Sequence, residues 1–259
     1  NKQESLICTI LIFHQVNAQF PLIIAANRDE FYERPSTIPH KNDSFYAGID
    51  QKAGGSWMGA TKDGFIVGIT NQRTKNPPIP QLRSRGDLVL KALQMGQTQK
   101  VLQLLQHPSK TNAFNLLFGR ATDLYVAYGH DPNQPPHVEK VPPGFHILPN
   151  GKCNDQNFFN VSNTKKRLQP LLQLPWPQLR QHLFLELQNN QRATHPDPMP
   201  KWLDDWGLVL SSLFVESPKY GTCSSTIICA KQQKLIEYWF AEHYPTHSKK
   251  GCFFPVFPS

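Results

Sequence analysis

The chain has 259 residues, of which 39% are hydrophobic and 18% charged, and these values exclude a disordered or collagen-like chain. The 27 Lys and Arg exceed the 19 Asp and Glu, and the net charge of +8 favours an anionic ligand. The basic residues are scattered, and the longest clusters, Lys165–Arg167 and Lys249–Lys250, are too short for a nucleic-acid surface. We therefore expect no nucleic-acid partner.

The cysteines and the N-terminal sequence bear on the compartment. Five cysteines form neither a CxxC pair nor an even-numbered set, which favours the reducing cytoplasm over a disulfide framework. Residues 6–13 are apolar, but Glu4 precedes them and no small-residue cleavage site follows, so they do not fit a signal peptide. No apolar stretch approaches the roughly 20 residues that span a bilayer. We expect a cytoplasmic protein without integral membrane association.

Short apolar segments and longer amphipathic ones predict the elements in chain order. Apolar segments at 7–13 and 22–26, joined by a polar loop, predict a hairpin, and 64–70 predicts a third strand. Ser84 and Asp87 resemble a capping box before a helix over 85–96, and a second helix follows from Thr98. Strands at 114–118 and 124–128, a helix from about Pro177, and strands at 226–230 and 235–241 complete the set.

This mixed order of strands and helices favours an α+β fold, with helices layered on antiparallel sheet. Prolines gather at 77–80, 132–143 and 196–200, which is typical of surface loops rather than linkers because apolar strands resume after each. We expect one domain over residues 1–259.

The second predicted strand runs into Asn27, Arg28, Asp29 and Glu30, and a polar switch at a strand end is typical of a site. A carboxylate beside an arginine keeps its charge and fixes the guanidinium, which is one way to orient a substrate or a nucleophile. The alternative is a solvated turn with local salt bridges.

Cys8 lies in the first arm of the predicted hairpin, across from the end of the second arm. A thiol near Arg28 would have its thiolate favoured, as in reactive cysteines. The alternative is a small buried hydrophobe in an apolar strand.

Three further segments end or begin strands with polar groups. The turn at 54–59 presents Trp57, and Asn71 follows the strand at 64–70, where its amide would stabilise an oxyanion or cap the strand. Thr222 and Cys223 precede a late strand and would line a cleft or form turns. HExxH, P-loop and GxGxxG signatures are missing from the sequence, so we expect no metal and no cofactor.

Several motifs together carry a family resemblance. They are Cys8-Thr9, AANRDEFYERP (25–35), AGGSWMGATKDG (53–64), TNQR (70–73), SRG (84–86), FNLL (114–117), PPGFHILPNGKCND (142–155) and YGTCSS (220–225). In this order they resemble the NRDE-motif family, also known as the transport and Golgi organisation protein 2 family, and its bacterial branch. The motifs cover almost the whole chain.

The resemblance implies an N-terminal-nucleophile hydrolase-like fold, a four-layer αββα sandwich. Similar amidases use an N-terminal Cys whose own amino group is the general base, and Cys8 and Asn27–Glu30 occupy the corresponding positions. By the same analogy Asn71 would fill the oxyanion hole and Asn150 a second substrate-facing position. Cys223 stands where many eukaryotic members have Arg.

The seven residues before Cys8 bear on this mechanism, because an amide nitrogen cannot accept a proton. Residues 1–7 are therefore a removable extension, or the natural start differs, or the protein does not catalyse. The resemblance leaves two functions open: a cysteine amidohydrolase acting on a non-peptide acyl-amide bond, and a non-catalytic carrier of haem, acyl-CoA or another lipid.

Either function needs a pocket for a small-molecule ligand. Trp57 and Phe31 would form apolar walls, and Arg28 and Arg85 would bind carboxylates or phosphates. The sequence leaves the oligomeric state open.

Overall fold

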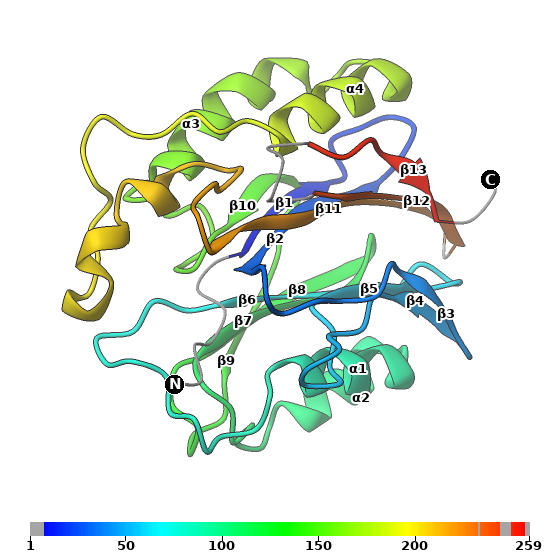
Figure 1. Ribbon diagram of the computed structural model, residues 1–259. Helices are drawn as coiled ribbons and strands as arrows, with labels where there is room; N and C mark the ends of the chain where they lie inside the picture. Colours follow the sequence, from blue (N-terminus) through cyan, green and yellow to red (C-terminus); the bar gives the residue numbers. More distant parts are fainter. Residues whose placement is uncertain (1–7, 233, 244–249, 257–259) are drawn as a thin grey trace.

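The computed structural model describes residues 8–232, 234–243 and 250–256. Two antiparallel sheets face each other, and helices cover both outer faces (Figure 1). The first sheet has the order β10 (Gly144–Leu148), β1 (Cys8–His14), β2 (Leu22–Phe31), β11 (Tyr220–Lys231), β12 (Lys234–Glu242) and β13 (Phe254–Pro255). The second sheet follows the sequence: β3 (His40–Asn42), β4 (Phe45–Ala47), β5 (Met58–Thr61), β6 (Ile66–Asn71), β7 (Phe114–Arg120), β8 (Asp123–Gly129) and β9 (His137–Lys140).

The helices form the two outer layers. The helices α3 (Phe159–Leu168) and α4 (Trp176–Leu187) lie over the first sheet, and α1 (Gly86–Met95) and α2 (Thr98–Leu104) over the second (Figure 1). Three short 3₁₀ helices, η1 (Gln169–Leu171), η2 (Lys201–Trp206) and η3 (Val209–Ser211), lie in the connections between α3 and β11. The predicted α+β class and the four-layer αββα sandwich are confirmed.

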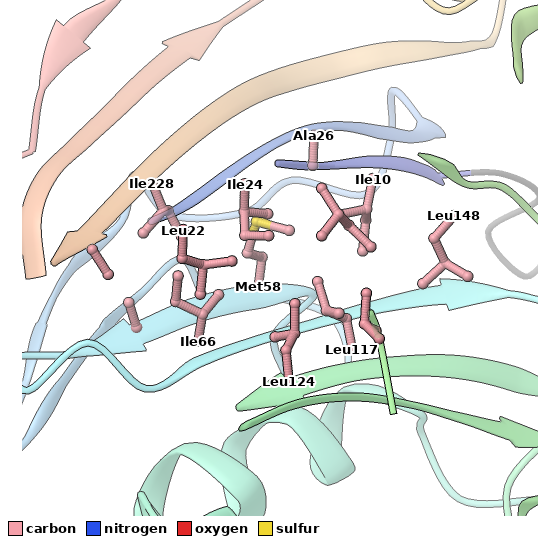
Figure 2. Close-up of a cluster of buried hydrophobic side chains, with 14 of the residues drawn as sticks. Ile10, Leu22, Ile24, Ala26, Met58, Ile66, Leu117, Leu124, Leu148 and Ile228 are labelled. Atoms are coloured by element: carbon pink, nitrogen blue, oxygen red, sulfur yellow. The ribbon is translucent and has the colours of Figure 1, made fainter. Parts of the chain in front are cut away.

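The central strands are apolar throughout because both of their faces are buried. In β1, Ile10 and Ile12 enter the core between the sheets, where they meet Ile24 of β2 and Met58 of β5 (Figure 2). The alternate residues of these strands pack beneath α3 and α4. Because successive side chains of a strand point to opposite faces, each central strand contributes to two cores, one between the sheets and one beneath the helices.

The two sheets approach closely at β6. A methyl group added to Gly68 would lie 3.1 Å from Ile10 Cδ1 of β1 and 2.8 Å from Met58 Cε. This contact sets β1 opposite β6, so that the start of β1 and the end of β6 bound the same end of the space between the sheets.

The structure corrects several predicted boundaries. The strand predicted at 22–26 continues to Phe31, and the strand predicted at 226–230 begins at Tyr220, because these polar extensions pair with each other from Tyr220↔Phe31 to Ser225↔Asn27. The capping box is wrong: Ser84 Oγ accepts the Gly86 N–H at 3.2 Å, and Arg85 takes the N-cap position. The helix α3 and the short strands β3, β4, β5, β9, β10 and β13 were not predicted.

None of the helices in the described part of the chain is long and apolar enough to cross a membrane. The proposed removable segment, residues 1–7, lies outside the described residues.

Candidate active site

Cys8 and Arg28 are direct cross-strand partners in the β1–β2 hairpin. Their side chains share one face of the sheet, as partners in an antiparallel pair do. That face looks toward the second sheet, since the Arg28 guanidinium lies over the Trp57 ring at 5.0 Å from its centroid. Cys8 is 8% exposed. The predicted closeness of Cys8 and the 27–30 segment is confirmed.

The interpretation of residues 27–30 as a turn is wrong, because they form buried strand and so point alternately to opposite faces. Arg28 and Glu30 face the space between the sheets. Asn27 faces the α3/α4 layer, where its Nδ2 donates to Leu187 O at 2.8 Å and Leu213 O at 2.9 Å. Asp29 lies on the same face as Asn27, and its Oδ1 accepts a hydrogen bond from Thr222 Oγ1 at 2.5 Å.

A cavity of about 320 Å³ opens beside Cys8 between the two sheets. Cys8, Arg28 and Glu30 line it from the first sheet, and Trp57 and Asn71 line it from the second. Ile69 of β6 and Gly86 at the start of α1 also line the cavity. The connecting segments complete the lining with Arg34, Asp50, Lys52, Ala53, Gly55, Ser56, Pro80, Leu82, Arg83, Ser84 and Arg85.

One wall of the cavity is a contact between two backbones. A methyl group added to Gly55 would lie 2.7 Å from Gly86 Cα, and one added to Gly86 would lie 2.9 Å from Ser56 N. Ser56 N also donates to Gly86 O at 3.3 Å. The GGSW turn therefore packs directly on the start of α1, and the glycines are required by this close approach.

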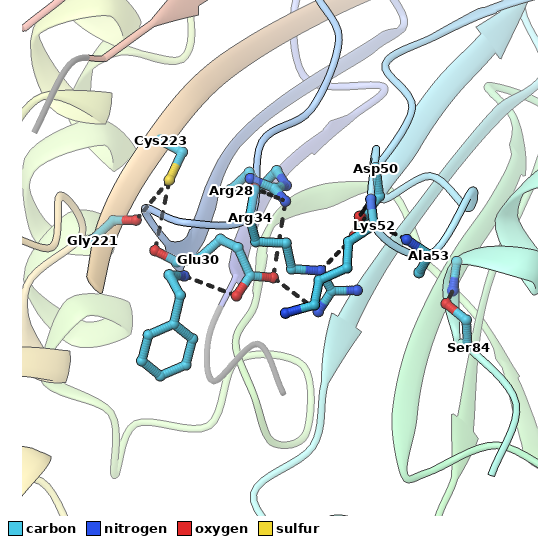
Figure 3. A network of polar contacts seen from close by, with 11 residues as sticks. Arg28, Glu30, Arg34, Asp50, Lys52, Ala53, Ser84, Gly221 and Cys223 are labelled. Atoms are coloured by element: carbon cyan, nitrogen blue, oxygen red, sulfur yellow. Dashed lines mark hydrogen bonds and ion pairs between the residues drawn. The ribbon is translucent and has the colours of Figure 1, made fainter. Parts of the chain in front are cut away.

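A chain of charges crosses the cavity (Figure 3). Glu30 lies 3.3 Å from Arg34 Nη1 and 3.9 Å from Arg28 Nη2, and Arg34 Nε lies 2.7 Å from Asp50 Oδ2. Burial raises the pKa of Glu30 above its usual range, although the two arginines oppose this shift. These contacts hold the four side chains in fixed positions along the cavity lining.

The Cys8 thiol is protonated in this environment. Burial, and after it the Asp29 carboxylate, raise its pKa from 9.0 to about 12 against the opposing effect of Arg28. Burial also raises the pKa of Asp29 from 3.8 to about 7. Arg28 lowers the pKa of Cys8, as expected, but in the chain with Cys8 in mid-sequence desolvation outweighs the nearby cation.

Asn71 and Asn150 lie side by side at the ends of β6 and β10. Asn150 Nδ2 donates to Asn71 O at 2.6 Å, and Asn71 lines the cavity. Asn150 Oδ1 is buried and has no hydrogen-bond partner in the described part of the chain. Arg85 also lines the cavity, and its Nε donates to Ala113 O at 2.9 Å and Asn112 O at 3.3 Å.

Four predicted substrate-binding residues are not among the described residues that line the cavity: Phe31, Asn150, Thr222 and Cys223. By the alternation of β2, Phe31 lies on the same face as Asn27 and Asp29, away from the cavity. It packs edge-to-face on Tyr220, with ring centroids 5.1 Å apart. The Thr222 hydroxyl donates its hydrogen bond to Asp29, as described above. The Cys223 thiol, in the β11 irregularity between Thr222 and Ser224, donates to Glu30 O at 3.6 Å and Gly221 O at 3.5 Å.

The sequence reading missed four charged residues of the cavity: Arg34, Asp50, Lys52 and Arg83. Arg34 follows Glu30 by four residues within the quoted AANRDEFYERP motif, which was a usable signal. The others lie on loops, and their approach to Cys8 depends on the packing of the two sheets.

The comparisons with known proteins agree with this geometry. The family described as Transport and Golgi organisation 2 matches residues 7–245. The Transport and Golgi organization protein 2 homolog of Homo sapiens is 29% identical over an alignment of 254 residues, which covers 81% of this chain and 82% of the human one. The Drosophila melanogaster Transport and Golgi organization protein 2 is 24% identical over 260 residues, with coverages of 89% and 90%.

A solved structure shares the fold. The Caenorhabditis elegans N-acylethanolamine-hydrolyzing acid amidase ortholog superposes with a TM-score of 0.53 at 11% identity, over 86% of this chain and 92% of that chain. This likeness confirms the N-terminal-nucleophile hydrolase-like fold. Since the family match spans nearly all of the sequence, the chain belongs to the Transport and Golgi organisation 2 family.

Proposed function

We propose that the protein is a cysteine amidohydrolase that acts on a non-peptide acyl-amide bond once Cys8 carries a free α-amino group. The observation that carries this proposal is the placement of Cys8, Arg28 and Asn71 around one cavity, because it puts a thiol, a cation and an amide within a single substrate site. The amidase of similar fold acts, as its name says, on N-acylethanolamines, which are acyl amides.

The reaction would proceed through a thioester. The α-amino group takes the Cys8 thiol proton, sulfur bonds to the acyl carbon, and the Asn71 amide donates to the oxyanion. The C–N bond then breaks, and the leaving amine takes the proton from the α-ammonium group. Water attacks the thioester, the C–S bond breaks, and the carboxylic acid and the thiol are released.

A free α-amino group on Cys8 is required because the thiol is otherwise protonated. With its pKa near 12, Cys8 does not ionise at neutral pH, and its amide nitrogen in the given chain cannot accept the proton. A chain that begins at Cys8 gains a base attached to the same residue.

The test compares the intact chain with a chain that begins at Cys8, released by a specific protease site placed before it. We expect the chain beginning at Cys8 to release amine from at least one N-acylethanolamine, bile-acid amide or acyl-amino acid. Cys8→Ser should abolish turnover and keep binding, whereas the matched control Cys223→Ser, outside the cavity lining, should retain both. A correctly folded chain beginning at Cys8 that hydrolyses none of these amides rejects the proposal. Intact mass of the purified protein shows whether the preceding residues are removed.

The second candidate function is a non-catalytic carrier of haem, acyl-CoA or another anionic lipid. The observation that favours it is the burial of Cys8, which is 8% exposed and whose pKa is raised by that burial. A carrier binds such ligands saturably, is insensitive to Cys8→Ser, and loses affinity on Trp57→Ala.

We place either function in the cytoplasm. All five cysteines are free thiols, which fits a reducing compartment.

A further inference from the structure

The cavity beside Cys8 is bounded by more charge than an alkyl chain requires. Five cationic side chains and two carboxylates line it. Pockets for small molecules are lined mainly by apolar and aromatic side chains, with few polar groups. Among the described lining residues, the sizeable apolar surfaces are those of Trp57, Ile69, Pro80 and Leu82. This lining favours a short, charged ligand over a long acyl chain.

Both carboxylates of the cavity are already neutralised by two of the five cations. Glu30 pairs with Arg34 at 3.3 Å and Arg28 at 3.9 Å, and Asp50 pairs with Arg34 at 2.7 Å. Asp50 Oδ1 also accepts two backbone N–H groups of the following turn, at 2.9 and 3.1 Å. Figure 3 shows this network of Arg28, Glu30, Arg34 and Asp50.

The remaining cations lie on two loops that belong to the second sheet's side of the cavity. Lys52 lies in the turn before β5, and Arg83 in the segment before α1. In the described part of the chain neither makes an ion pair with a carboxylate. Arg85 lines the same side of the cavity, and its Nε donates to backbone carbonyls. Lys52 and Arg83 therefore give this side of the cavity a positive potential, and such a potential attracts an anion.

We propose that Lys52 and Arg83, together called the basic wall, bind a carboxylate of the substrate. The acyl amide that reacts at Cys8 then carries a separate anionic group, on its acyl or its amine side. The cavity volume of about 320 Å³ lies at the small end for ligand pockets, which fits a short substrate. This inference rests on the amidohydrolase function proposed above for the chemistry, and on the cavity itself for the binding.

Binding to the intact chain tests the basic wall without any turnover. Isothermal titration at low ionic strength compares N-acetylglycine, with its carboxylate on the amine side, and succinamic acid, with its carboxylate on the acyl side, each against its neutral methyl ester. We expect at least one acid to bind about 10-fold more tightly than its ester, because a paired charge is worth more in a partly enclosed site than in water. This preference should shrink as salt screens the wall.

Matched variants assign the preference to its residues. Lys52→Gln with Arg83→Gln should reduce the preference to below about 2-fold, since the unpaired charges are gone. The control Lys91→Gln with Lys140→Gln removes the same net charge at exposed positions that are not among the lining residues, and should leave the preference unchanged. Lys52 and Arg83 are both exposed, so either single variant serves if the double variant does not fold.

The outcomes separate the two proposals. Three outcomes would overturn the proposed carboxylate site at the basic wall, even if neutral amides are hydrolysed. They are equal affinity for acids and esters, no binding of any of the four probes, and an acid preference that survives Lys52→Gln with Arg83→Gln. Acid-selective binding that depends on these two residues supports the basic wall, even if the chain beginning at Cys8 hydrolyses nothing and the amidohydrolase proposal fails.

Discussion

Asp29 makes the stability of the fold depend on pH, and Asp29→Asn exposes this dependence. The Asp29 carboxyl is 1% exposed, and burial raises its pKa from 3.8 to about 7. Between these values the folded chain holds a proton that the unfolded chain has released, so stability falls as pH rises through this window. The stabilising contribution is complete below about pH 4 and lost above about pH 7. A shift of about 3 units, at 1.36 kcal/mol each, gives an upper bound of about 4 kcal/mol.

The asparagine cannot ionise, and its Oδ1 can still accept the hydrogen bond that Thr222 Oγ1 donates to Asp29 at 2.5 Å. We therefore expect the free energy of unfolding of Asp29→Asn, measured relative to the original chain, to rise by several kcal/mol, up to about 4, between pH 4.5 and pH 8. Urea denaturation at both pH values measures this difference, and the m-value checks that the two transitions expose the same surface.

The exposed Asp131 provides the matched control, because Asp131→Asn removes one carboxylate outside any buried environment. Its effect on unfolding should be nearly the same at both pH values. If Asp29→Asn also shows the same effect at pH 4.5 and pH 8, the carboxyl is not held protonated by burial and the reasoning is refuted.

Two further predictions concern thiol reactivity and the outer face of the first sheet. In the intact chain at pH 8, iodoacetamide should label the exposed Cys252 much faster than Cys8, because a pKa near 12 leaves only about one Cys8 side chain in ten thousand as thiolate. Peptide mapping measures the order of labelling, and Cys8 labelled first would contradict the prediction. Glu237 Oε2 accepts the indole N–H of Trp176 at 2.9 Å and of Trp239 at 2.6 Å, so Glu237→Ala should lower the free energy of unfolding by about 2–4 kcal/mol. Glu237→Gln, which keeps an acceptor, should cost less in the same urea titration, and equal losses would show that the hydrogen bonds contribute nothing.

The apolar runs of the sequence predicted the strands that form the centre of the molecule. β1 and β2 are apolar at nearly every position before Asn27, so their burial and their hairpin follow from composition alone, and the pairing of Cys8 with Arg28 follows from the hairpin. The continuation of β2 through charged residues could not be predicted in this way. It depends on β11, whose polar start lies about 190 residues further along the chain and supplies Thr222 for Asp29.

The helix α3 escaped prediction because its buried face is partly polar. Asn160 Nδ2 donates to Thr9 Oγ1 at 3.3 Å, and Thr164 Oγ1 donates to Glu186 Oε1 at 2.9 Å. A helix face buried through hydrogen bonds to distant residues shows no regular spacing of apolar residues. A search for hydrophobic periodicity in the sequence therefore does not find it. The same limit applies to the basic wall, whose loop residues are brought to Cys8 by the packing of the two sheets.

The contact between Gly55 and Gly86 restricts how the substrate range of this family member can change. Because backbone meets backbone there, no rotamer change and no smaller side chain can widen the cavity on that side, and any larger residue would push the GGSW turn away from α1. Pro80, Leu82 and Arg83 also line the cavity, and they stand on an irregular segment between β6 and α1. Evolution toward larger or differently charged substrates would therefore proceed through substitutions and length changes in this segment, while the glycine contact stays fixed.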